Sequence, residues 1–182
     1  MSGSPPAAPA ARRGEGFVRA VRAVSTVCGW FAAAFTIIAL FVTCQMIFVR
    51  AVLGQSTIWQ TEAVIYLMIA ATVIGLPYVQ KLRGHVNVDL IPLALPFQAR
   101  RVLAYVTLSM TLVVIALLAW HSVHIWLEAY ERNWKSSTVW APRLWVPYLA
   151  LPLGFGLFVL QLLSDLVALA TGIDAPFGVR EA

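Results

Sequence analysis

The stretch that decides the fold is VSTVCGWFAAAFTIIALFVTCQMIFV, residues 24–49. It contains no charged residue over about 26 positions, enough for a helix to cross a hydrocarbon core of roughly 30 Å. A cleavable signal peptide is the competing interpretation, because the triplet Ala32–Ala34 is similar to a cleavage site. In a signal peptide the apolar segment precedes that site, whereas here most of it follows. The stretch therefore predicts an uncleaved transmembrane helix.

Three more apolar runs follow, at about residues 58–79, 102–127 and 144–170. The second begins after Thr57-x-x-Gln60, a pattern that predicts a capping box in which hydroxyl and amide satisfy unpaired N–H groups. Pro147 and Pro152 fall early in the fourth run, where we expect a kink. The fold class is therefore an all-α membrane protein with four transmembrane helices.

Composition agrees with this class. The chain is 60% hydrophobic and 12% charged, with a mean hydropathy of +0.81, whereas soluble domains are about half apolar and about a quarter charged. Residues 1–16 are rich in Pro, Ala, Gly and Ser, which predicts a disordered tail. The four-helix domain is expected over residues 17–171, followed by a C-terminal tail over 172–182.

The net charge of +5 does not indicate a nucleic-acid partner, because the basic residues lie in short gaps between apolar runs. Their distribution predicts that both termini and the loop after the second span are cytoplasmic. That side carries nine Lys and Arg: Arg12, Arg13, Arg19, Arg22, Lys81, Arg83, Arg100, Arg101 and Arg180. The opposite side carries four, namely Arg50, Arg132, Lys135 and Arg143.

Five tryptophans gather at the outer ends of the spans or in the third loop: Trp59, Trp126, Trp134, Trp140 and Trp145. Indoles favour the membrane interface, because one edge is apolar and the N–H needs a partner. Membrane anchoring accounts for this pattern, and a broad outer surface that meets a partner protein is the alternative.

Ionisable residues inside the spans are few. Glu62 lies about one turn inside the second span, where the helix dipole favours a carboxylate and where a packing or partner contact is the alternative. Asp165 lies near the inner end of the fourth span and can reach interfacial water. No charged residue is expected near the midplane, which argues against an independent channel or carrier.

His121, His124 and Glu128 fall on one helix face, a spacing that can hold a metal ion. They lie at the outer end of a span, where such residues are often simply interfacial, and no further ligand cluster accompanies them. Two histidines on one face also cannot approach both faces of a haem. We therefore predict no catalytic, cofactor-binding or metal-binding residue.

Ala71-x-x-x-Gly75 offers close helix packing, because small residues four apart let backbones approach in lipid. The inner loop then begins with KLRGHVNVDL, residues 81–90. Gly84 permits a sharp turn, and His85 and Asp89 share one face if the segment is helical. The apolar and basic residues that follow predict an amphipathic cytoplasmic elbow lying in the interface.

Four pieces of the sequence carry a family resemblance: WQTE at 59–62, Gly75, RGHVNVDLI at 83–91 and PYLALPLGF at 147–155. Together they resemble the small permease subunit (DctQ-like) of tripartite ATP-independent periplasmic (TRAP) transporters, over roughly residues 26–170. The G-H-x-x-V-D element is the most specific of them.

The resemblance implies a non-catalytic scaffold in the bacterial inner membrane, without a cofactor. It would pack against a large permease subunit during sodium-coupled uptake of an organic acid delivered by a periplasmic substrate-binding protein. Arg83, Gly84, His85, Val88 and Asp89 would form the inner elbow, and Trp59 and Glu62 would mark the outer start of the second span. A membrane anchor of a redox complex, holding haem or quinone, is the alternative function.

Overall fold

The structure is a computed structural model that describes residues 9–82 and 96–173. The described parts contain the helices α1 (Pro9–Val52), α2 (Ile58–Lys81), α4 (Phe97–Glu131), α5 (Trp145–Tyr148) and α6 (Ala150–Ala170). Four segments are long and apolar enough to cross a membrane, with α5 and α6 together forming the fourth. The predicted all-α class with four transmembrane helices is confirmed. The predicted elbow lies outside the described residues.

Helix α1 is longer than the sequence predicts. It has 44 residues and begins at Pro9, inside the stretch over residues 1–16 that the sequence predicts as a tail. Proline fits the first position of a helix, and the alanines and arginines that follow have high helix propensity. The helix ends at Val52, and Gly54 then turns the chain with a φ of 61°, a left-handed conformation that suits glycine.

The second and third spans also extend past their apolar runs. The second reaches Lys81 and the third covers Gln98–Glu131, whereas the fourth, Trp145–Ala170, keeps the predicted bounds to within one residue. The apolar run shows only the part of a helix that contacts hydrocarbon. The backbone hydrogen bonds of the helix continue beyond it into the polar interface. The positions of the four spans are thus as predicted, and the ends of the first three helices lie further out.

The predicted capping box is wrong in its hydrogen bonds. Thr57 does occupy the N-cap of α2, but its side chain makes no capping bond, and its backbone lies at φ −117° and ψ 31°. The side chain of Gln60 is buried, and its Oε1 has no hydrogen-bond partner among the described residues. Because Gln60 packs inward, its amide does not fold back toward Thr57.

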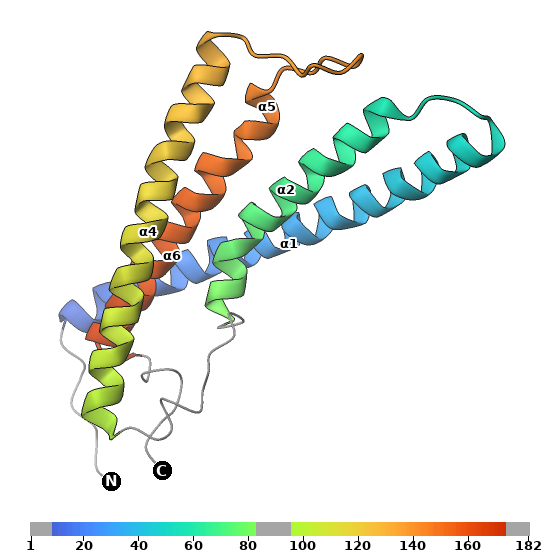
Figure 1. The fold of residues 1–182 in the computed structure, drawn as a ribbon. Coiled ribbons are helices and arrows are strands. Elements are labelled where there is room, and N and C mark those ends of the chain that lie inside the picture. Colours follow the sequence, from blue (N-terminus) through green and yellow to red (C-terminus); the bar gives the residue numbers. More distant parts are fainter. Residues whose placement is uncertain (1–8, 83–95, 174–182) are drawn as a thin grey trace.

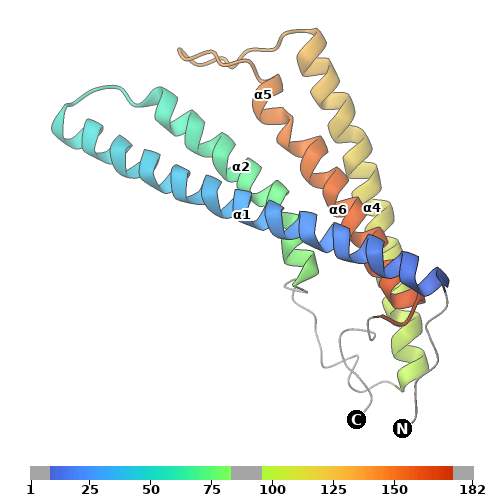
Figure 2. The same cartoon turned by 180° about the vertical axis from the view of Figure 1, so that it is seen from behind.

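The helices form two antiparallel pairs, α1 with α2 and α4 with α6 (Figure 1). Helices α2 and α6 also pack against each other, and α1 crosses α6 on the far side of the bundle (Figure 2). The two pairs diverge toward the end that carries the α1–α2 and α4–α5 connections. Helix α4 packs mainly on α6, so α2 and α6 occupy the centre.

The central helices α2 and α6 approach each other closely at Gly154 of α6. A Cβ atom added there would lie 2.6 Å from the carbonyl oxygen of Val73 in α2, and 2.5 Å from the Cγ1 of the same valine. No side chain fits in that space. Glycine therefore lets the backbones of α2 and α6 touch. Such van der Waals packing stabilises helix association in lipid, where hydrophobic attraction between helices is absent.

Helix α1 approaches α2 in a similar way. A Cβ atom at Gly75, the position predicted to permit close packing, would lie 3.3 Å from the Cβ of Ala32. One helical turn further along, the ring of Tyr78 fills the space beside Gly29. Buried Pro77 lies between these contacts, and Figure 1 shows that α2 changes direction over its last turns.

The fourth span is interrupted where the two prolines predict. Helix α5 ends at Tyr148 and α6 begins at Ala150, so Leu149 separates them. Pro152 has no N–H to donate to the carbonyl of Tyr148, which removes one bond of the helical ladder. The Leu149 N–H donates to the carbonyl oxygens of Trp145 and Val146, at 3.2 and 3.3 Å. The regular helix is therefore interrupted at Leu149, and the kink itself stays a prediction.

We predict that Gly154→Ala destabilises the folded chain by about 1–3 kcal/mol, the usual cost of overpacking. The reason is the missing space beside Val73. Thermal unfolding in mild detergent, followed by size-exclusion chromatography, measures the effect. Gly156→Ala is the matched control, because nothing lies within 4 Å of a Cβ added there. Equal melting temperatures for the two variants would contradict the packing described.

Candidate functional site

Glu62 is the centre of a polar cluster at the end of the bundle that carries the α1–α2 and α4–α5 connections. Its carboxylate accepts hydrogen bonds from the hydroxyl of Tyr66, at 2.7 Å, and from the hydroxyl of Thr138, at 2.5 Å. Tyr66 lies one turn along α2, whereas Thr138 belongs to the connection between α4 and α5. Glu62 itself is 8% exposed. It therefore bonds within its own chain and attaches the connection to α2.

The α4–α5 connection is a hairpin, residues 132–144. Lys135 and Arg143 pair as an isolated antiparallel bridge. The Leu144 N–H donates to the carbonyl of Trp134, at 2.9 Å, and the Ser136 N–H donates to that of Pro142, at 3.1 Å. These bonds fix the hairpin's base, and Glu62 fixes its tip to α2.

The hairpin presents an exposed apolar tip. Val139 is 89% exposed, and Trp140 is 45% exposed beside it. The indole of Trp140 meets that of Trp59 edge to face, with ring centroids 6.3 Å apart. Trp59, predicted to mark the outer start of the second span, thus belongs to a surface shared by α2 and the hairpin, which we call the tip surface (Trp59, Val139 and Trp140).

A second aromatic contact holds the hairpin's other side. The indole N–H of Trp126 in α4 donates to the carbonyl of Trp145, at 3.1 Å. The ring of Tyr130 stacks on Trp126 and meets Trp145 edge to face. Four of the tryptophans predicted to gather at this end therefore form two contact groups, one at the tip and one at the base.

A further polar cluster joins three helices near the opposite end. The Ser25 hydroxyl of α1 donates to Oε1 of Gln161 in α6, at 2.6 Å. The Gln161 amide donates to Asp165, at 2.8 Å, and the amide of Gln80 in α2 donates to the other carboxylate oxygen, at 3.0 Å. We call these four residues the inner tether.

Sequence reasoning missed most of the inner tether. It singled out Asp165 alone, as a residue able to reach interfacial water. The available signal was Gln161, an amide inside the apolar run FVLQLLSD and one turn before Asp165. Ser25 and Gln161 are 2% and 0% exposed, so their bond lies in the interior of the bundle, where an unpaired amide is costly.

The His121, His124 and Glu128 face separates into individual contacts. Nδ1 of His121 lies 3.2 Å from the Leu117 carbonyl, and His124 packs edge to face on Trp120. Glu128 pairs with Arg132 at 3.2 Å on the surface. Over residues 9–82 and 96–173, no group of three His, Cys, Asp or Glu side chains is arranged to hold a metal ion.

The predicted site residues thus divide into two groups. Trp59, Glu62 and Gly75 lie in α2, the first two near its N-terminal end and Gly75 at its contact with α1. The predicted elbow residues Arg83, Gly84, His85, Val88 and Asp89 lie outside the described residues. The clusters in the described residues connect helices and a loop to one another. Their polar side chains hold these elements in position.

We predict that Glu62→Ala releases the hairpin and speeds tryptic cleavage after Lys135 and Arg143 several-fold, because Thr138 loses its acceptor on α2. Mass spectrometry of timed digests of the full chain in detergent measures this rate. Glu128→Ala is the control, since its ion pair with Arg132 is on the surface and contributes little. Identical digestion of both variants would mean that Glu62 does not hold the hairpin.

We predict that Gln161→Leu lowers the stability of the bundle by about 1 kcal/mol or more, since interhelical hydrogen bonds in membranes contribute about 0.6–2 kcal/mol each. The change removes the acceptor of Ser25 and one donor to Asp165. Gln45→Leu is the control, because Gln45 is an exposed glutamine of α1. Thermal unfolding of the two variants measures the difference in stability. Equal stability of Gln161→Leu and Gln45→Leu would rule out the tether.

Comparisons with known proteins agree with this architecture. A family model of the DctQ component of tripartite ATP-independent periplasmic transporters matches residues 39–172. The ectoine TRAP transporter small permease protein TeaB of Halomonas elongata is 30% identical over 125 residues, 69% of this chain. The match spans 64% of that protein's length. No solved structure matches the chain.

The four spans and the family match make this an integral protein of the inner membrane. The chain belongs to the DctQ component family, the small permease subunits of TRAP transporters.

Proposed function

We propose that this chain is the non-catalytic scaffold of its transporter. It packs against a large permease subunit, which moves the substrate, during sodium-coupled uptake of an organic acid. The proposal rests on the hydrogen bonds that the polar side chains of the spans make. Glu62, Gln161 and Asp165 all bond to other residues of the same chain. Side chains that hold a fixed frame together are not available to bind a moving substrate.

The close backbone contacts support the same proposal. Gly154 against Val73 and Gly75 against Ala32 leave no space for one helix to slide past another without a clash. A carrier needs two arrangements of its helices around one site. Contacts of this kind favour a single arrangement, as a static frame requires.

The large permease subunit is the proposed partner within the membrane. Helices α1 and α4 lie at the outside of the bundle and present many large apolar side chains away from it. On α1 these include Trp30, Phe31, Leu40 and Phe41, and on α4 they include Val102, Met110, Val113 and Leu117. Such faces suit lipid or the apolar surface of another membrane subunit, and the family resemblance favours contact with the latter over part of this area.

The tip surface is the proposed contact for a periplasmic substrate-binding protein. The distribution of Lys and Arg favours cytoplasmic termini, which would turn the hairpin and the tip surface toward the periplasm. Exposed tryptophan and valine held in place by Glu62 offer a preformed apolar contact, and aromatic residues are enriched at protein interfaces.

The elbow sequence RGHVNVDLI keeps its proposed role as the connection that fixes α2 relative to α4. The transported compound is proposed only as an organic acid, on the strength of the family resemblance. The relative from Halomonas elongata is named for ectoine, and a compound of that kind is a second candidate. The redox-anchor alternative loses its support, because the family match covers most of the chain.

We predict that tagged chain purified from its native membrane brings a large permease subunit with it in about equal amount. Reconstituted with that subunit and the binding protein, it supports sodium-dependent uptake of radiolabelled organic acid. Liposomes that contain this chain alone show none, because the described polar groups are occupied in holding the frame.

The controls separate the claims of this proposal. Liposomes that contain the large subunit without this chain test whether the scaffold is needed at all. A reduced-minus-oxidised spectrum of the purified chain tests for haem. Uptake by the isolated chain would overturn the scaffold role, and purification without any large membrane subunit would overturn the partner.

A further inference from the structure

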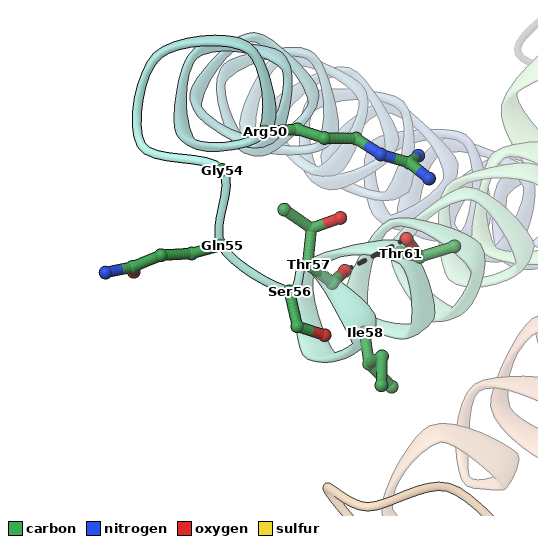
Figure 3. Close-up of a pocket in the computed structure, with 7 residues that line it drawn as sticks. All are labelled: Arg50, Gly54, Gln55, Ser56, Thr57, Ile58 and Thr61. Atoms are coloured by element: carbon green, nitrogen blue, oxygen red, sulfur yellow. Dashed lines mark hydrogen bonds between the residues drawn. The ribbon is translucent and has the colours of Figure 1, made fainter.

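A cavity of about 490 Å³ opens between the end of α1, the loop at residues 53–57 and the first turn of α2 (Figure 3). It lies at the same end of the bundle as the tip surface but on the α1–α2 pair. Its lining residues are Arg50, Gly54, Gln55, Ser56, Thr57, Ile58 and Thr61. None of these is acidic, and Arg50 supplies a positive charge.

Arg50 extends its guanidinium across this cavity (Figure 3). In the part of the chain that the structure describes, its side chain makes no hydrogen bond or ion pair, and the residue is exposed. A guanidinium carries five N–H donors in a planar fork that matches the oxygens of a phosphate or carboxylate. The cavity therefore suits an anion.

Thr57 provides the second donor. The residue is 7% exposed, yet its hydroxyl makes no capping bond to α2. Figure 3 shows this hydroxyl on the side of the cavity toward which Arg50 extends. The Thr61 hydroxyl, in contrast, donates to the Thr57 carbonyl, at 3.0 Å. Within residues 9–82 and 96–173 the Thr57 hydroxyl has no hydrogen-bond partner, so it can donate to a ligand in the cavity.

The surroundings identify the kind of anion. Arg50 follows directly on the apolar run that ends at Val49, so the cavity lies at the depth where hydrocarbon gives way to headgroups. Beside it, α1 exposes Ile47, Phe48 and Val52, and Leu53 follows. A free anion would gain nothing from these apolar groups, whereas the acyl chains of a phospholipid would cover them.

We propose that this cavity binds a phospholipid, with its phosphate held by the Arg50 guanidinium and the Thr57 hydroxyl and its acyl chains along the exposed face of α1. The N-terminus of α2, whose first N–H groups lack a side-chain cap, adds favourable dipole orientation for a negative charge. Neither a large permease subunit nor a binding protein is needed for this site.

The test is native mass spectrometry of the full-length chain in mild detergent, titrated with phosphatidylglycerol. We expect one tightly retained lipid, and a roughly tenfold loss of affinity in Arg50→Gln, because hydrogen bonds to charged groups are worth about that factor or more. Arg132→Gln is the matched control, an exposed arginine near the same end whose partner is Glu128. It should retain lipid as the unchanged protein does.

Two further measurements keep the proposal falsifiable. Thr57→Val retains the shape of the side chain and removes the hydroxyl, and should weaken retention about threefold even if Arg50→Gln folds poorly. Inorganic phosphate is the competing probe. Displacement of the lipid by phosphate at equal concentration would assign the cavity to a free anion and overturn the lipid. Equal retention by Arg50→Gln, Thr57→Val and the control would overturn the site altogether.

Discussion

The contact between Gly154 and the backbone of Val73 is the constraint on which the rest of the bundle depends. It sets the distance between α2 and α6, the two central helices, to that of touching backbones. At that separation the amide of Gln80 reaches Asp165 across the same helix pair, at 3.0 Å. Lipid does not drive helices together as water does, so shape and hydrogen bonding have to supply the specificity. A single position without a side chain thereby decides which polar groups can meet.

Helix α2 is fixed at both ends by different chemistry. Near its start Glu62 accepts bonds from Tyr66 and the hairpin, and near its end Gln80 donates to α6. Between them Gly75 and Pro77 permit close packing and a change of direction. Fixing two ends of a helix prevents both rotation about its axis and tilting. This is the behaviour expected of a stationary subunit, and it explains why the polar residues of the spans concentrate near the ends and leave the middle apolar.

The sequence predicts the spans, the family and the break in the fourth span because each depends on local composition: apolar length, a short motif, and the missing N–H of Pro152. It could not predict the inner tether, since Ser25 and Gln161 are 136 positions apart and meet only once the helices cross. It predicted a capping box at Thr57 that does not form, because the burial of Gln60 outweighs a local bond. For Glu62 the sequence offers the helix dipole and a packing or partner contact as interpretations, and it could not predict the hydrogen bond from Thr138, 76 positions away. Helix α1 begins at Pro9, inside the stretch with a tail-like composition, because that stretch also includes good helix formers.

Helix α1 has a consequence for the surrounding membrane. Its apolar stretch of about 26 residues is roughly 39 Å long, which exceeds a hydrocarbon thickness of about 30 Å. An upright helix would be mismatched, and a tilt of about 40° removes the difference. In Figure 1, α1 does lie at a steep angle to α4. Because α1 is bound to both α2 and α6, its tilt cannot change without moving the helix pairs relative to each other. Because the close contacts fix that arrangement, the tilt of α1 stays the same in membranes of different acyl-chain length, and the lipid around α1 has to adapt its thickness instead.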